Sequence, residues 1–225
     1  KLAGNLAGKF YTYTVYFADG SVNKDAMDPY AKSASVNGKK AAIINLNATN
    51  PAGFYSNSGP AVASSADAIV YEIHVRDMSI DPNAPFVNKG KYLAFTERGL
   101  TLNGEPVGID HLKELGITHV QLMPIYDFGS VDEASSEAQF NWGYDPQNYN
   151  VPEGSYATDP TDPVKRVNEL KQMINALHEA GIGVIMDVVY NHTFDTDVTS
   201  PFNKVVPGYY YRTDDTGKFT NGSGC

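Results

Sequence analysis

Gly183-Val-Ile-Met-Asp-Val-Val-Tyr-Asn-His192 is the stretch on which the interpretation of this fold depends. Its apolar run is typical of a parallel strand that is covered on both faces. Asp187 interrupts the run, and a buried carboxylate is costly unless a cation or several donors satisfy it. Polar residues then follow at Tyr190, Asn191 and His192, at the strand end where α/β proteins bind ligands. The sequence thus indicates a site here; the alternative is that Asp187 is a structural ion-pair partner and His192 begins a loop.

Two strand-and-helix units precede this stretch. The sequence predicts strands at residues 68–75 and 119–125 and helices at residues 107–116 and 163–180, the second helix being capped by Asp162. Repeated units of this kind specify a parallel α/β sheet or barrel. An eight-stranded barrel needs about 250 residues. We therefore predict an α/β fold in which the chain contributes the first three strands of a (β/α)8 TIM-type barrel.

The beginning of the chain has a different character. Short alternating segments are separated there by the turn signals Asp19-Gly20 and Asn37-Gly38, which is typical of β-sandwich hairpins. The strands are too few for a whole sandwich. We predict that residues 1–50 are the C-terminal part of a β-sandwich and that residues 51–66, rich in proline, glycine and serine, are a linker. Residues 67–225 then form the three barrel units, with a long loop after the third strand.

Composition excludes several classes of partner. The net charge of -9, with 26 acidic against 17 basic residues and no basic cluster, argues against nucleic acid and anionic membranes. No apolar run reaches the roughly 18 residues that a transmembrane helix needs. Cys225 is the single cysteine, so the sequence has no intrachain disulfide and no cysteine-based metal site. The 15 tyrosines could stack on sugar rings, although packing is the commoner use of such rings.

A loop of about 35 residues between the second strand and the second helix is longer than usual, and such loops are commonly functional. It contains Phe140-Asn-Trp-Gly-Tyr-Asp-Pro146. Trp142 and Tyr144 offer rings for stacking, Asp145 could accept hydrogen bonds from hydroxyl groups, and Gly143 would let the backbone approach a ligand. The alternative is that the two rings only pack the loop onto the barrel.

These residues carry a family resemblance that covers nearly the whole chain. Asp187-Val-Val-Tyr-Asn-His192 resembles the first conserved region of the α-amylase superfamily, glycoside hydrolase family 13. Phe140-Asn-Trp-Gly-Tyr-Asp-Pro146 resembles the signature of type I pullulanases, debranching enzymes that cut α-1,6 bonds. Tyr71-Glu-Ile-His-Val-Arg-Asp77 is similar to their first barrel strand, and residues 11–30 are similar to the end of the starch-binding-type sandwich before it. The resemblance implies retaining hydrolysis of branch linkages in pullulan, amylopectin and limit dextrins.

The resemblance also implies a role for each candidate residue. Asp187 matches a supporting carboxylate that braces the arginine near the nucleophile. Tyr144 matches the ring under the sugar at the cleavage point, Asp145 and Trp142 lie beside it as binding groups, and His192 matches the donor to that sugar's primary hydroxyl. Neither the family's nucleophile nor its acid, which follow the fourth and fifth strands, has a counterpart in this sequence.

Asn191 matches a position that binds calcium in many amylases and that serves by hydrogen bonding in pullulanase-like members. We therefore expect Asn191 to bind substrate. We expect no metal ion in the site and no required cofactor, and the question of a structural calcium ion elsewhere stays open. Two further groups carry less weight. We interpret the first group, Asp195, Asp197, Asp214 and Asp215, as solvated turns rather than calcium ligands. We interpret the second group, His74, Arg76 and Asp77, as a structural polar network.

The expected partners are an α-glucan and a complementing C-terminal piece that supplies the remaining barrel strands. We expect no nucleic acid and no membrane as partners, and no debranching activity from this chain alone. The substrate class favours a secreted or cell-surface protein, with a cytoplasmic one left open. The alternatives are an α-amylase, isoamylase or branching enzyme, disfavoured by residues 142–146, and a non-catalytic glucan-binding protein.

Overall fold

The computed structural model describes residues 3–137, 139–222 and 224. Cys225 lies outside these described residues. Among them, no helix combines the length and the apolar character that crossing a membrane would require.

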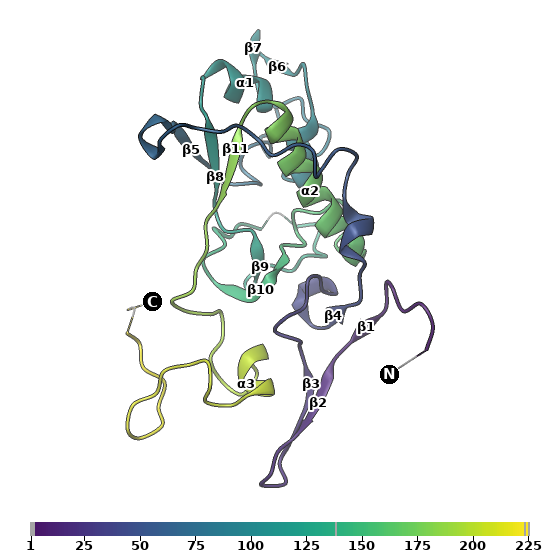
Figure 1. Ribbon diagram of the computed structural model, residues 1–225, viewed down its shortest axis with the longest axis vertical. Helices are drawn as coiled ribbons and strands as arrows, with labels where there is room; N and C mark the ends of the chain where they lie inside the picture. The colour runs from purple at the N-terminus through teal and green to yellow at the C-terminus, as the bar shows by residue number, and fades with distance from the viewer. Residues whose placement is uncertain (1–2, 138, 223, 225) are drawn as a thin grey trace.

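A three-stranded parallel sheet lies in the upper part of the molecule as drawn in Figure 1. β8 (His119–Leu122) lies between β5 (Val70–Ile73) and β11 (Gly183–Met186). Val70 and Gly183 both lie opposite His119, so the three strands begin at the same level. The parallel order agrees with the predicted alternation of strands and helices, although each strand is shorter than the apolar run that predicted it.

Two helices follow the strands as predicted. α1 (Ile109–Glu114) buries Ile109 and Leu112. α2 (Pro163–Glu179) begins where the Asp162 side chain accepts a hydrogen bond of 2.8 Å from the backbone N–H of Val164, and it ends before Gly181, whose φ of +79° suits glycine. α2 packs against β11 and against the 3-10 helix η4 (Tyr92–Thr96) (Figure 1). The main core lies between these helices and β8, whose Val120 and Leu122 are fully buried.

The other face of the sheet is uncovered in this chain. Val70 on β5 and Ile185 on β11 share the face opposite to the buried Val120 and Leu122, and they are 46% and 36% exposed. Tyr71 and Met186, on the core-facing side of the two outer strands, are also 45% and 41% exposed. The prediction that residues 183–192 form a strand covered on both faces is therefore wrong for this chain. The physical reason is that β11 is an edge strand, with no further strand beside it among the described residues.

The long loop after β8 contains a hairpin that the sequence analysis did not predict. β9 (Tyr126–Phe128) pairs antiparallel with β10 (Pro146–Pro152), with two register shifts. β10 begins and ends with proline and carries amides between, a composition that is typical of loops. Burial on both sides, against the core and against the first 50 residues, overrides that local preference.

The first 50 residues form two short antiparallel strand pairs. The assignment of these pairs to the end of a β-sandwich stays a prediction. β1 (Phe10–Tyr11) pairs with β4 (Ala41–Ala42), and β2 (Tyr13–Tyr16) pairs with β3 (Val22–Ala26). The boundaries at residues 50 and 66 also stay predictions. The remaining elements are η1 (Val36–Gly38), η2 (Leu46–Thr49), η3 (Ser65–Asp67), the hairpin of β6 (Thr101–Leu102) and β7 (Glu105–Pro106), and α3 (Pro201–Val205).

Leu177→Ala tests the assignment of the core. Leu177 is fully buried in the main cluster, so we expect the substitution to lower the free energy of unfolding by about 2–5 kcal/mol. Leu115→Ala is the matched control, because Leu115 is 47% exposed, and it should change stability by less than about 1 kcal/mol. Urea unfolding followed by circular dichroism measures both, and equal losses would contradict this packing.

Candidate functional site

Two predicted site residues meet beyond the end of β11. Asp187 directly follows this strand, and its backbone N–H donates to the carbonyl oxygen of Leu122 over 3.2 Å. The Tyr144 hydroxyl donates to Asp187 Oδ2 over 2.9 Å. Burial, together with the hydrogen bond to Asp187, raises the pKa of Tyr144 to about 12, so at neutral pH the hydroxyl keeps the proton that it donates.

Asp187 is half-buried rather than buried, which corrects the expectation from its apolar neighbours. Val188 beside it is 39% exposed, because β11 is an outer strand of the sheet in the described part of the chain. No ion pair of Asp187 with a basic group is found among the described residues. The resemblance implies that Asp187 braces an arginine, and this role stays a prediction.

His192 fastens the loop that carries Tyr144. Its Nε2 lies 2.5 Å from the backbone oxygen of Tyr144, and its Nδ1 lies 2.9 Å from Asn191 Nδ2. An amide N–H can only donate to Nδ1, so the proton of the neutral ring is on Nε2 and is donated to Tyr144. Both ring nitrogens thus bind protein groups, and the donation from His192 to a sugar hydroxyl stays a prediction, as does substrate binding by Asn191.

The turn before Tyr144 is held by its own polar side chains. Asn141 Nδ2 donates to Asp145 Oδ1 over 2.9 Å, and Asn141 Oδ1 accepts from the N–H of Gly143 over 2.7 Å. The Ser130 hydroxyl donates to Asp145 Oδ2. Both oxygens of Asp145 therefore accept hydrogen bonds within the loop, and its binding of a sugar hydroxyl stays a prediction.

Gly143 serves a purpose other than the predicted approach to a ligand. Its φ is +91°, and a Cβ atom there would lie 2.4 Å from the backbone oxygen of Pro124. The glycine thus lets the loop pack closely on the segment that follows β8, and the predicted approach of its backbone to a ligand stays a prediction.

The Trp142 ring is open to solvent. It is 61% exposed and meets the edge of Phe140 at 6.3 Å between ring centroids. Phe140 packs on His74 at 5.1 Å, and the Arg76 guanidinium lies 5.8 Å from the Phe140 ring. Sugar stacking by Trp142 and the alternative that it only packs the loop onto the barrel both stay predictions.

The end of β5 carries the polar network that the sequence analysis expected. His74 Nε2 lies 2.8 Å from the backbone oxygen of Asn141 and 3.0 Å from the hydroxyl of Tyr156. Arg76 pairs with Asp77 over 2.7 Å. These side chains hold the loop of residues 140–146 to the segment that follows β5, and this structural role needs no bound ligand.

Sequence reasoning missed Tyr149, which supports the site from β10. Its hydroxyl donates to the backbone oxygen of His192 over 2.8 Å, and its ring packs against Tyr126, Tyr190 and Phe202. The alternation of Asn148, Tyr149, Asn150 and Val151 is the signal that could have identified this strand.

The acidic residues after His192 form turns, as expected. Asp214 Oδ1 accepts from the backbone N–H groups of Thr216 and Lys218 over 2.8 Å and 3.1 Å. The Asp197 carboxylate is likewise bound by Thr199, and hydrogen bonds of this kind lower the pKa of both aspartates. Charged turns of this kind need no metal ion.

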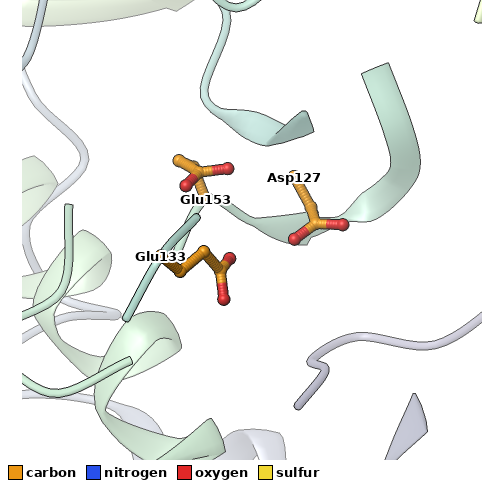
Figure 2. Close-up of side chains that lie close together, drawn as sticks. All are labelled: Asp127, Glu133 and Glu153. Carbon is orange, nitrogen blue, oxygen red and sulfur yellow. The ribbon is translucent and has the colours of Figure 1, made fainter. Parts of the chain in front are cut away.

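One group of three acidic side chains in the described part of the chain has a spacing that suits a metal ion. Its members are Asp127, Glu133 and Glu153, all buried, with candidate ligand oxygens within 4.8 Å of one another (Figure 2). Arg166 already lies among them: its guanidinium nitrogens are 2.9 Å from Glu133 and 3.5 Å from Asp127. Hydrogen bonds already occupy both oxygens of Glu133 and both oxygens of Glu153. Too few free oxygen ligands are left for a calcium ion, so these residues do not fit one, and we derive no step through it.

The chain is similar to proteins of known function along its length. The family model described as "Alpha amylase, catalytic domain" matches residues 74–215. The pullulanase of Bacillus subtilis (strain 168) is 44% identical over 99% of this chain, which spans 30% of that protein. This chain is thus similar to about a third of a longer polypeptide.

Two solved structures superpose closely. The pullulanase from Paenibacillus barengoltzii, in complex with maltohexaose and alpha-cyclodextrin, has a TM-score of 0.95 and is 51% identical, covering 100% of this chain and 35% of its own. The pullulanase from Bacillus acidopullulyticus has a TM-score of 0.93 and is 53% identical, covering 100% of this chain and 27% of its own.

Gly143→Ala tests the close packing under the loop. We expect it to lower the free energy of unfolding by about 1–3 kcal/mol more than Gly104→Ala does, because overpacking adds to backbone strain. Gly104 is a matched control: it has the same φ of +91° but nothing within 4 Å of its Cβ position. Urea unfolding of both variants measures the difference, and equal losses would contradict the contact with Pro124.

Proposed function

The chain belongs to the alpha-amylase catalytic-domain family, and from that membership we propose that it supplies the sugar-binding wall of a pullulanase-type debranching enzyme. The reaction proposed for the whole protein is hydrolysis of α-1,6-glucosidic branch linkages in pullulan, amylopectin and limit dextrins. It would proceed with retention at the anomeric carbon, through a covalent glycosyl intermediate.

The observation that carries this proposal is the contact between Tyr144 and Asp187. Their side chains come from two motifs that are far apart in the sequence and join through a hydrogen bond of 2.9 Å. The close superposition on a pullulanase solved with maltohexaose supports a glucan as the ligand of this edge. Both motifs that resemble debranching enzymes therefore contribute to one surface.

The proposed roles are those of binding and orientation. The Tyr144 ring offers a flat apolar face to a glucose ring, and the hydrogen bond from its hydroxyl to Asp187 fixes the ring's orientation. Trp142, Asp145, Asn191 and His192 border this ring as further sugar contacts. We assign the nucleophile and the general acid to the part of the protein that completes the barrel.

The uncovered face of the sheet supports a larger assembly. Val70, Tyr71, Ile185 and Met186 expose apolar surface, and β11 has a free edge. Free edges and apolar faces favour pairing with further strands. We propose that these are strands one to three of an eight-stranded barrel, completed by a C-terminal piece, and that residues 1–50 end a carbohydrate-binding-like sandwich.

A non-catalytic glucan-binding protein is the second candidate, because the described residues supply binding groups without a nucleophile. The exposed Trp142 favours it as much as it favours an enzyme. We propose a secreted or cell-surface location for either, since polymeric α-glucans are too large to be taken up intact. Activity separates the two candidates.

Tyr144→Ala tests the sugar-binding role. In the assembled protein, meaning this chain together with the strands that complete its barrel, we expect at least about a tenfold loss of affinity for a linear maltooligosaccharide, equal to about 1.4 kcal/mol. Tyr144→Phe keeps the ring and should retain most of the affinity. Tyr55→Ala is the control, because Tyr55 is 79% exposed and contacts Asn47 rather than the site. Isothermal titration calorimetry measures all three, and an unchanged affinity of Tyr144→Ala would contradict the role.

Release of reducing sugar from pullulan tests the enzyme. The 225-residue chain alone should release none, whereas the assembled protein should hydrolyse the polymer. Glucan binding by an assembled protein that releases no sugar would favour the non-catalytic candidate. Hydrolysis by the chain alone would contradict the assignment of nucleophile and acid to the rest of the barrel.

A further inference from the structure

Four charged side chains meet in the interior, and Figure 2 shows the three acidic ones among them. Asp127, Glu133 and Glu153 are 1%, 6% and 0% exposed, and Arg166 is 0% exposed. If all four were ionised, three negative charges would face one positive charge. An uncompensated charge without water is far too costly to persist, so the group must bind protons or a further cation.

The single cation is committed to one of the three acids. Arg166 donates to both oxygens of Glu133, through Nη1 over 3.1 Å and Nη2 over 2.9 Å. Two parallel N–H···O bonds of this kind form a neutral, tightly held pair. Glu133 also accepts hydrogen bonds from the backbone N–H groups of Asn37 and Gly154, over 2.7 Å and 2.9 Å.

Asp127 and Glu153 remain without a cation of their own. Glu153 accepts the N–H groups of Ser155 and Phe128 over 2.8 Å and 3.1 Å. Asp127 Oδ2 accepts from Asn148 over 2.6 Å, but Asp127 Oδ1 is buried without a hydrogen-bond partner and lies 3.5 Å from Arg166. A lone buried oxygen of this kind is far less costly in a neutral carboxyl group than in a carboxylate.

The electrostatics of the interior agree with retained protons. Burial raises the pKa of Asp127 well above its usual range, and burial and the charge of Glu133 raise the pKa of Glu153 to about 7. Other titratable groups face the pair: Glu133, Arg166, Lys91, Tyr92 and Tyr156. Lys91 is a partly buried cation that donates to the backbone of Ser155 rather than to either carboxyl group.

The cluster anchors the hairpin on which the sugar-binding edge rests. Asp127 lies in β9, and Glu153 directly follows β10. The same hairpin holds the site at two points: the Gly129 N–H donates to the backbone oxygen of Asp145 over 3.1 Å, and the Tyr149 hydroxyl donates to that of His192 over 2.8 Å. A shift of the hairpin would therefore move the loop of Tyr144 and the segment of His192 together.

We propose that Asp127 and Glu153 retain at least one proton in the folded protein, and that this proton keeps the β9–β10 hairpin in the position that sugar binding requires. Both are positioning residues, because they act through the hairpin and do not touch the sugar. The coupling to sugar binding rests on the proposed function; the retained proton does not.

The direction of the pH effect follows from the raised pKa values. The folded protein binds protons more tightly than the unfolded chain, whose carboxyl groups titrate at about 4. Stability therefore falls as the pH rises from about 4 toward the value of about 7 reached by Glu153 in the folded protein. When the pair loses its last proton, two negative charges face each other without a cation of their own, the hairpin loosens, and affinity for the glucan falls with it.

Asp127→Asn tests the proposal in the assembled protein. The amide keeps the shape and the contact with Asn148 but cannot ionise, so we expect the affinity for a maltooligosaccharide to fall at least threefold less between pH 6 and pH 8 than in the unsubstituted protein. Asp132→Asn is the matched control, since Asp132 is exposed on the same loop, and it should keep the original pH dependence. Equal pH dependence in all three proteins would overturn the coupling.

Carboxyl-selective 13C NMR of the unsubstituted protein tests the proton directly, without glucan and without a variant. The expected result is that at least one of the Asp127 and Glu153 signals titrates near pH 7 or above. Ionisation of both below pH 5 would overturn the retained proton. Absence of glucan binding at every pH would contradict the proposed function and the coupling, while the NMR titration would still decide the proton.

Discussion

The buried pair of Arg166 and Glu133 is the interaction on which the rest of this structure depends. It joins α2 to the loop between β9 and β10. Through the N–H of Asn37 it also binds the first 50 residues. Without this pair, a guanidinium and three carboxyl groups would be buried without a partner for the guanidinium charge. An uncompensated buried charge is strongly destabilising. The pair thus fixes three distant parts of the chain in one arrangement.

This arrangement also positions the residues of the candidate site. Gly38 packs against Asp127 and Asn148 so closely that a Cβ atom would lie 2.3 Å from Asp127 Oδ2. β10, the second strand of the hairpin held in this way, begins directly after Asp145, so the loop that carries Tyr144 has a fixed base. Asp187 then meets Tyr144 from the neighbouring strand end. The support of the candidate site is thus charged and buried, whereas Tyr144 and Asp187 themselves are half-exposed.

Membership of the alpha-amylase family explains why one face of the sheet is uncovered. The catalytic domains of this family are TIM-barrel-type folds, and this chain forms part of one. An apolar sheet face without cover is unusual in a finished domain. Asp187 is half-buried at the end of an outer strand, and no ion pair of it with an arginine is found among the described residues.

Local sequence determined what local physics controls. Asp162, Pro163 and Gly181 bound α2 through capping and φ preferences, and the apolar runs gave the parallel strands in the right order. Motifs identified Tyr144, Asp187 and His192 as one site, and the structure brings them together. These features depend on neighbours in the chain or on strand ends that a parallel sheet must align.

Only the tertiary structure decided the rest. Asp127, Glu133, Glu153 and Arg166 are individually typical surface residues, and nothing in their local sequence predicts that they are buried together. β10 has the composition of a loop and became a strand because both its sides are covered. Gly143 was explained only by the backbone of Pro124 beside it. In each case the deciding partner is distant in the sequence, and the energy of burial outweighs the local preference.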